Sequence, residues 1–114
     1  MSQAAETNEI RLAWIPCPNS EVAAAIAEAA IVRNLAACAN IVPGVAAIYR
    51  WKGEIRHDSE VILLVKTTTD RELELTEVVV AMHPYELPAI SYLPVSGGHG
   101  PFLDWIRAET SRPV

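Results

Sequence analysis

The feature that most restricts the fold is a long strand–turn–strand segment in the middle of the chain. Residues 36–51 have an extended pattern that Pro43-Gly44 bends, and residues 54–69 form a second arm that ends in a run of apolar residues. Lys52-Gly53 between them is typical of a hairpin turn. At ~3.3 Å per residue, arms of about 16 residues would each reach about 50 Å. Strands in small domains are usually shorter.

The rest of the chain supplies one helix before the hairpin and two after it. Period-two and period-3.6 patterns predict strands over 10–15, 36–43 with 45–51, 54–69 and 87–95, and helices over 20–34, 71–82 and 101–109. Ser20 and Asp70 are expected to cap the first two helices. The order β-α-β-β-α-β is that of an α+β, ferredoxin-like fold with a short C-terminal helix. We expect a single domain over residues 10–110, a flexible segment over 1–9 and a tail over 111–114.

Two arms longer than the domain is wide require a partner, because projection into water would leave apolar side chains and a strand edge exposed. Ile48, Tyr49 and Trp51 are the candidates for such an interface. In pairing with a second copy, backbone hydrogen bonds between strands would provide the affinity, and the contacts of these side chains would provide the specificity. Closed symmetry would leave no free edge, so we predict a closed homo-oligomer. The alternative is a monomer whose hairpin folds back over its own sheet.

Charge and hydropathy exclude several classes of partner. No window approaches the roughly 20 apolar residues that span a bilayer. The first residues lack a basic start and an apolar stretch, so we expect no secretory signal and a cytoplasmic location. The net charge is −5 and the basic residues are scattered, which argues against binding to nucleic acid.

The sequence shows no signature of catalysis. It has no Gly-x-Ser-x-Gly element, and the glycine cluster at 96–100 lacks the lysine and the spacing of a phosphate-binding loop. We therefore expect a protein that is not an enzyme.

Metal ligands are a more open question. His83 lies at the expected end of a helix, where it could bind a metal or equally cap the last carbonyls. Cys17 and Cys38 are further candidates, although each is also explained as a small buried residue. None of the three belongs to a local pair with metal-binding spacing.

Lys66 directly follows the apolar run of the second arm, where an isolated ammonium would be unfavourable. Glu86 is a reasonable partner for it. If assembly builds a cleft there, Lys66, Tyr85 and Glu86 could line a ligand site; an ion pair that fixes a subunit border is the alternative.

Several motifs together resemble the CutA family, the divalent-cation tolerance proteins. They are Leu35-Ala-Ala-Cys-Ala-Asn-Ile-Val-Pro-Gly44, Ile48-Tyr-Arg-Trp-Lys-Gly-Glu54, Lys66-Thr67, His83-Pro-Tyr-Glu-Leu-Pro88 and Leu93-Pro94. The resemblance covers about residues 10–109. It implies a ferredoxin-like domain in a tight trimer formed by intersubunit strand pairing, in the bacterial cytoplasm. It also implies a link to tolerance of copper and other divalent metals, and a PII-like architecture compatible with signalling.

The resemblance also bears on the metal ligands. Copper ligands proposed for the family, a first-strand cysteine and a His-His pair, match Ile15, Met82 and His83 here, so only His83 is retained. Cys17 would face the same side of the strand as Ile15 and could substitute. Two functions follow: a non-enzymatic trimer that binds copper or another divalent cation weakly, or a PII-like signalling or scaffold trimer with a small metabolite in its intersubunit cleft.

Overall fold

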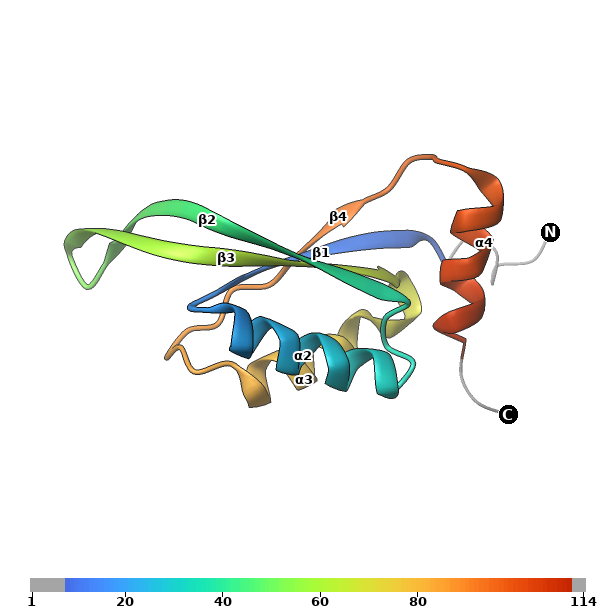
Figure 1. The fold of residues 1–114 in the computed structure, drawn as a ribbon, viewed down its shortest axis with the longest axis horizontal. Helices are drawn as coiled ribbons and strands as arrows, with labels where there is room; N and C mark the ends of the chain where they lie inside the picture. Colours follow the sequence, from blue (N-terminus) through green and yellow to red (C-terminus); the bar gives the residue numbers. More distant parts are fainter. Residues whose placement is uncertain (1–7, 112–114) are drawn as a thin grey trace.

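The structure, a computed structural model, describes residues 8–111. Its elements are β1 (Ile10–Cys17), α2 (Ser20–Val32), β2 (Cys38–Trp51), β3 (Glu54–Thr68), the 3₁₀ turn η1 (Thr69–Arg71), α3 (Glu72–Met82), β4 (Ser91–Pro94) and α4 (Gly100–Glu109). The four strands form one antiparallel sheet in the order β2-β3-β1-β4. Helices α2 and α3 lie against one face of the sheet, and α4 lies at the end opposite the hairpin tip (Figure 1). The expected α+β fold and its order of elements are confirmed.

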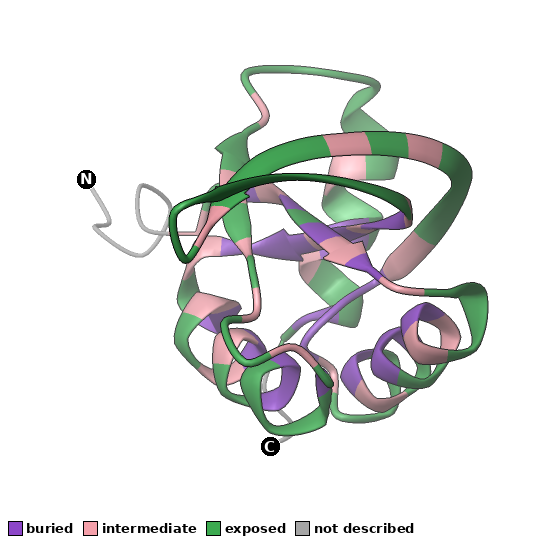
Figure 2. Ribbon diagram, turned by 90° about the vertical axis from the view of Figure 1, so that its left-hand side faces the viewer, coloured by how far each residue is buried: buried purple, intermediate pink, exposed green. Residues whose placement is uncertain are grey.

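The core lies between the sheet and the two helices. Alternate residues of β1 and β3 are buried there because side chains of a strand point to opposite faces in turn. The alanines of α2, among them Ala23, Ala27 and Ala30, are also buried and let the helix lie close to the sheet. Figure 2 shows burial concentrated in this layer. The part of the β2–β3 hairpin nearest the Lys52-Gly53 turn, called the outer hairpin below, is exposed along most of its length.

The predicted long hairpin is confirmed, and its two strands are the longest elements of the described chain. β2 and β3 pair from Cys38↔Lys66 to Trp51↔Glu54, and the described chain extends over 50 × 25 × 23 Å. At its tip Lys52 has φ 50° and Gly53 has φ 82°. Two successive positive φ values match the twist of the flanking strands, as in a type I′ turn.

Strand β2 is continuous through Pro43-Gly44, where the sequence predicted a break or a bend, and the irregularity takes the form of a bulge. The pairing shifts between Val42, which faces Ile62, and Val45, which faces Glu60. Three steps along β2 therefore match two along β3, which defines a bulge with one extra residue. Gly44 has φ 72°, a conformation that favours glycine.

Both predicted helix caps were wrong by a short distance. Asn19, not Ser20, caps α2: its Oδ1 accepts a hydrogen bond from the Val22 amide at 2.9 Å. Asp70 lies inside η1 and accepts from the Thr68 hydroxyl at 2.6 Å, so α3 begins without a side-chain cap. After α2 the chain leaves the helix through Asn34, whose φ of 58° is left-handed.

The first and last strands of the chain also differ from expectation. β1 continues through Pro16 to Cys17, and β4 covers only Ser91–Pro94 instead of 87–95. Two predictions fall largely outside the described residues: the flexible segment over 1–9, of which residues 1–7 are not described, and the tail over 111–114, of which residues 112–114 are not described.

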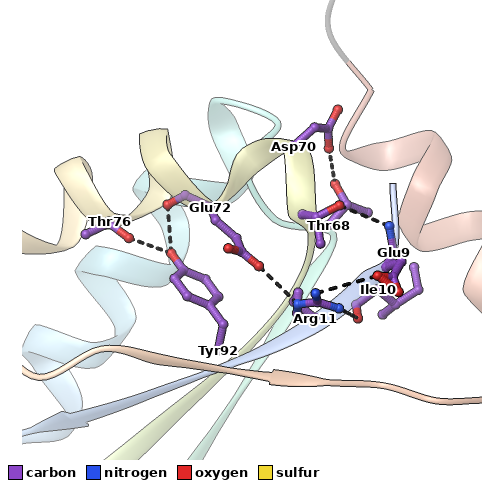
Figure 3. Close-up of polar contacts among 9 residues, drawn as sticks. Glu9, Ile10, Arg11, Thr68, Asp70, Glu72, Thr76 and Tyr92 are labelled. Atoms are coloured by element: carbon purple, nitrogen blue, oxygen red, sulfur yellow. Dashed lines mark hydrogen bonds and ion pairs between the residues drawn. The ribbon is translucent and has the colours of Figure 1, made fainter. Parts of the chain in front are cut away.

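Side-chain contacts fasten α3 to the sheet (Figure 3). Arg11 of β1 pairs with Glu72 at 3.1 Å, and the Tyr92 hydroxyl of β4 donates to the backbone oxygen of Glu72 at 2.9 Å. The same hydroxyl lies 2.8 Å from the Thr76 hydroxyl. These contacts fix the start of α3, and with it the position of the loop that follows the helix.

None of the helices within residues 8–111 has both the length and the apolar character needed to cross a membrane.

Candidate functional site

A groove of about 510 Å³ lies where the outer hairpin passes the loop that follows α3. The hairpin supplies one wall and residues 85–89 supply the other. Its lining residues are Pro16, Ala47, Tyr49, Arg50, Trp51, Arg56, Asp58, Glu60, Tyr85, Glu86, Leu87 and Ala89. The volume lies in the range typical of small-molecule sites.

The hairpin has two chemically different faces in this region. Directly opposite residues share a face, so Tyr49 lies beside Arg56, and Ala47 beside Asp58, on one side. Ile48 pairs with His57 and Arg50 with Ile55 on the other. Ile48 and Ile55 are 67% and 65% exposed, the most exposed apolar side chains of the hairpin.

This arrangement divides the three residues predicted for a subunit interface. Tyr49 and Trp51 share the face that lines the groove, whereas Ile48 lies on the opposite face. An interface with a second copy stays a prediction for all three.

Two tyrosine–carboxylate pairs organise the groove. The Tyr85 hydroxyl donates to Glu60 Oε2 at 2.9 Å, and the Tyr49 hydroxyl donates to Asp58. Burial, followed by the Glu60 contact, raises the pKa of Tyr85. The hydrogen bond to Asp58 is the main cause that raises the pKa of Tyr49. Both hydroxyls therefore stay protonated and act as donors at neutral pH.

Glu86, one of the lining residues, forms an ion pair with the hairpin tip. Its carboxylate lies 3.3 Å from Lys52 Nζ at the hairpin tip, and both side chains are about two-thirds exposed. Lys52 Nζ also lies 5.6 Å from the centroid of the Trp51 ring. Exposed pairs of this kind contribute little to stability, so the contact can open readily.

His83 lies behind the groove and is almost fully buried. Its Nε2 is 2.7 Å from the carbonyl oxygen of Pro16, which can only accept, so Nε2 carries the proton. Its Nδ1 accepts from the Tyr85 amide at 3.2 Å, and the two rings meet edge to face. Both ring nitrogens are thus occupied, and a metal would have to displace one of these hydrogen bonds.

The two cysteines lie far apart. Cys17 faces Val61, and Cys38 faces Lys66, five residues further along β3, which corresponds to roughly 17 Å. Cys17 is completely buried and its thiol donates to the Ile15 carbonyl at 3.6 Å, whereas Cys38 is partly exposed. Within residues 8–111, no three His, Cys, Asp or Glu side chains converge as a metal site would require.

Lys66 does not join Tyr85 and Glu86 within the chain. Its ammonium donates to Asn40 Oδ1 on the neighbouring strand, and it does not line the groove. Because Glu86 pairs with Lys52, the expected Lys66–Glu86 contact was wrong for the described chain. Tyr85 and Glu86 line the same groove, and a ligand site there stays a prediction.

Sequence reasoning missed Arg56, Asp58 and Glu60 as groove residues. Their spacing of two was the available signal, because it places all three on one face of a strand. The wall that makes this face concave comes from residues 85–89, which no local pattern connects to the hairpin.

Comparison with known proteins gives a consistent family assignment. Residues 11–109 match the family described as "CutA1 divalent ion tolerance protein". The divalent-cation tolerance protein CutA of Thermus thermophilus is 51% identical over 96 residues, which cover 84% of this chain and 93% of that protein. Human protein CutA is 43% identical over 101 residues, which cover 89% of this chain but only 56% of the human protein.

Solved structures agree with the sequence comparison. The Thermus thermophilus protein, at 48% identity, superimposes with a TM-score of 0.87 over 90% of this chain and 99% of its own. A protein from Archaeoglobus fulgidus, described as a periplasmic divalent cation tolerance protein, gives 0.86 at 34% identity, again over 90% of this chain and 99% of its own.

Proposed function

The chain belongs to the CutA1 divalent ion tolerance family, and from this we propose that it acts in divalent-cation tolerance as a cytoplasmic, non-enzymatic homotrimer. It binds copper or another divalent cation weakly, through His83 with Cys17 or Cys38. Both ring nitrogens of His83 already take part in hydrogen bonds, which supports weak metal binding. Coordination would require loss of a buried hydrogen bond, which opposes binding by about 1–3 kcal/mol.

Calorimetric titration with Cu²⁺ tests the metal site. His83→Gln should weaken binding by tenfold or more, whereas His99→Gln, a change in the turn before α4, should leave the isotherm unchanged. Because His83 is buried, paramagnetic broadening of its ring signals by Cu²⁺ in the unmodified protein provides a second measurement. Unbroadened His83 signals at saturating copper would exclude this residue as a ligand.

The hairpin supports the trimer. Strand β2 is a sheet edge, and the outer hairpin face presents Ile48 and Ile55 to solvent. Both features favour pairing with another copy. Light scattering should give about three times the 12.4 kDa of one chain. Ile48→Glu should shift the mass toward one chain, whereas Val32→Glu, at the 80% exposed end of α2, should not.

The strand order supports a ferredoxin-like assignment and a PII-like assembly. Closed association through the hairpins would place the groove near a subunit border. This provides a second candidate function, a signalling or scaffold trimer that binds a small metabolite.

The groove of about 510 Å³ is the observation that favours the second candidate. Tyr85 and Glu86 line it, and Lys66 would join them from a neighbouring subunit. A ligand at 100 times its Kd stabilises a folded protein by roughly 2.7 kcal/mol, so a thermal-shift screen of metabolites would detect it. The absence of shifts across a broad library would count against this candidate.

The location is tested by fractionation. The protein should remain with cytoplasmic markers after osmotic shock; release with periplasmic markers, as the name of the Archaeoglobus fulgidus relative would suggest, would overturn this part of the proposal.

A further inference from the structure

The groove combines negative charge with aromatic walls. Asp58 and Glu60 lie two residues apart on one face of β3, so their Cα atoms are about 7 Å apart. Each accepts one tyrosine hydroxyl, from Tyr49 and Tyr85 respectively. A carboxylate offers about four lone-pair sites, so each retains most of its capacity to accept hydrogen bonds.

The charge of these two carboxylates is not compensated by an ion pair. Among residues 8–111, neither Asp58 nor Glu60 lies within salt-bridge distance of a lysine, arginine or histidine. Arg56 shares their face but pairs with Glu54 at 3.8 Å, and Lys52 pairs with Glu86. Arg50, the other arginine of the lining, belongs to the opposite face of the hairpin and forms no ion pair with either carboxylate. The groove therefore favours a positively charged ligand.

The walls favour an organic cation over a bare ion. Tyr49, Trp51 and Tyr85 contribute aromatic rings, which attract ammonium groups through their faces. Pro16, Leu87 and Ala89 add apolar surface, against which methylene groups can lie. No set of three carboxylate, thiol or imidazole groups converges within residues 8–111, as a tightly held metal ion would need.

We propose that this groove binds a small aliphatic diamine, with one ammonium on Asp58, the other on Glu60, and the methylene chain against the aromatic and apolar walls. This identifies the chemical class of ligand for the second candidate function above and rests on it. Two acidic side chains whose Cα atoms are about 7 Å apart on one strand face can reach the two ends of a short diamine. The Lys52–Glu86 pair, formed by one lining residue, is exposed and can open as the ligand enters.

A series of three probes tests the charge requirement on the full-length protein. 1,4-Diaminobutane, n-butylamine and 1,4-butanediol have the same carbon chain with two, one and no ammonium groups. Calorimetry should show the diamine binding at least tenfold more tightly than the monoamine, and no heat for the diol. Equal affinities for the three, or no binding of the diamine, would overturn the proposal.

Matched variants locate the site. Asp58→Asn and Glu60→Gln should each reduce the diamine affinity to about that of the monoamine. Glu28→Gln should not, because Glu28 is an exposed residue of α2 outside the groove lining. NMR titration of the unmodified protein locates the bound diamine without any substitution, so its result does not depend on whether the variants fold. Shifts should concentrate at residues 47–60 and 85–89, and shifts confined to other segments would reject the groove as the site.

Failure of the diamine proposal can be distinguished from failure of either proposed function. A library screen that gives metabolite-induced shifts without diamine binding would reject the ligand class but retain the second candidate. Copper binding and trimer formation, measured on the same preparation, report on the first candidate independently.

Discussion

The His83 imidazole donates a hydrogen bond from Nε2 to the Pro16 carbonyl at 2.7 Å, and so joins the end of α3 to the end of β1. The same ring accepts from the Tyr85 amide. One buried histidine thereby positions both Pro16 and Tyr85, which are lining residues of the groove.

Replacement of His83 by alanine should lower the free energy of unfolding by about 2 kcal/mol. The change leaves the Pro16 carbonyl and the Tyr85 amide without their partners. Urea denaturation measures the loss. Glu86→Gln, three residues away and exposed, is the control and should change stability by less than about 0.5 kcal/mol. Similar losses for the two variants would contradict the role given to His83.

Cys17 should make stability fall at alkaline pH. Burial, followed by the nearby charge of Glu60, raises the pKa of its thiol from 9.0 to about 11. Between these values the unfolded chain loses the proton while the folded chain keeps it, so the free energy of unfolding falls as pH rises. The loss should be on the order of 1–3 kcal/mol by pH 11.

Urea denaturation at pH 8 and pH 10.5 checks this effect. Cys17→Ala should show a smaller decrease than the unmodified protein, because one of the groups that produce it has been removed. Cys38→Ala should retain the full decrease. A Cys17→Ala protein with an unchanged pH dependence would refute the assignment.

Arg71 should contribute more to stability than its ion-pair partner. Its guanidinium is buried, donates to the Asn34 carbonyl at 3.1 Å and lies 3.1 Å from Glu74. Arg71→Ala should lower the free energy of unfolding by about 2–3 kcal/mol, since it removes a contact between the end of α2 and the start of α3. Glu74→Gln should lower it by less than 1 kcal/mol, because that carboxylate is 43% exposed. The prediction fails if the order of the two losses is reversed.

Gly53 and Gly97 provide a test of backbone conformation alone. An added Cβ would meet no atom within 4 Å at either position, but Gly53 has φ 82° and Gly97 has an ordinary φ. Gly53→Ala should lower the free energy of unfolding by about 1 kcal/mol, through strain at the hairpin turn. Gly97→Ala should be neutral or slightly stabilising. Thermal unfolding of both variants makes the comparison, and equal melting temperatures would contradict it.

Local sequence patterns predicted the helices, strands and turns because these elements depend on the conformational preferences and the spacing of neighbouring residues. The turn at Lys52-Gly53 and the exit from α2 at Asn34 depend on positive φ, which few residues adopt readily. Caps were less predictable: Asn19 and Ser20 are adjacent residues of equal capping ability, and tertiary packing decides between them. The last strand was overestimated because β1 provides pairing partners for only four of its residues.

The candidate site was predictable only in part. Tyr85 and Glu86 were recognised from their loop, and they do line one groove. The carboxylates opposite them depend on how the hairpin curves past residues 85–89, a relation between segments that are distant in sequence. For the same reason, Lys66 was assigned to Glu86 when a closer acceptor, Asn40, lies on the neighbouring strand.

The extra residue at the β2 bulge determines which side chains of the outer hairpin meet the groove. Before it, Cys38, Asn40 and Val42 are opposite even-numbered residues of β3; after it, Ala47, Tyr49 and Trp51 are. Deletion of one residue between Val42 and Val45 would restore uniform pairing but exchange the two faces, so that Ile48 would turn inward and Tyr49 outward. Among homologous chains, the length of this short stretch would then distinguish those that can form the groove from those that cannot, independently of whether the tyrosine itself is present.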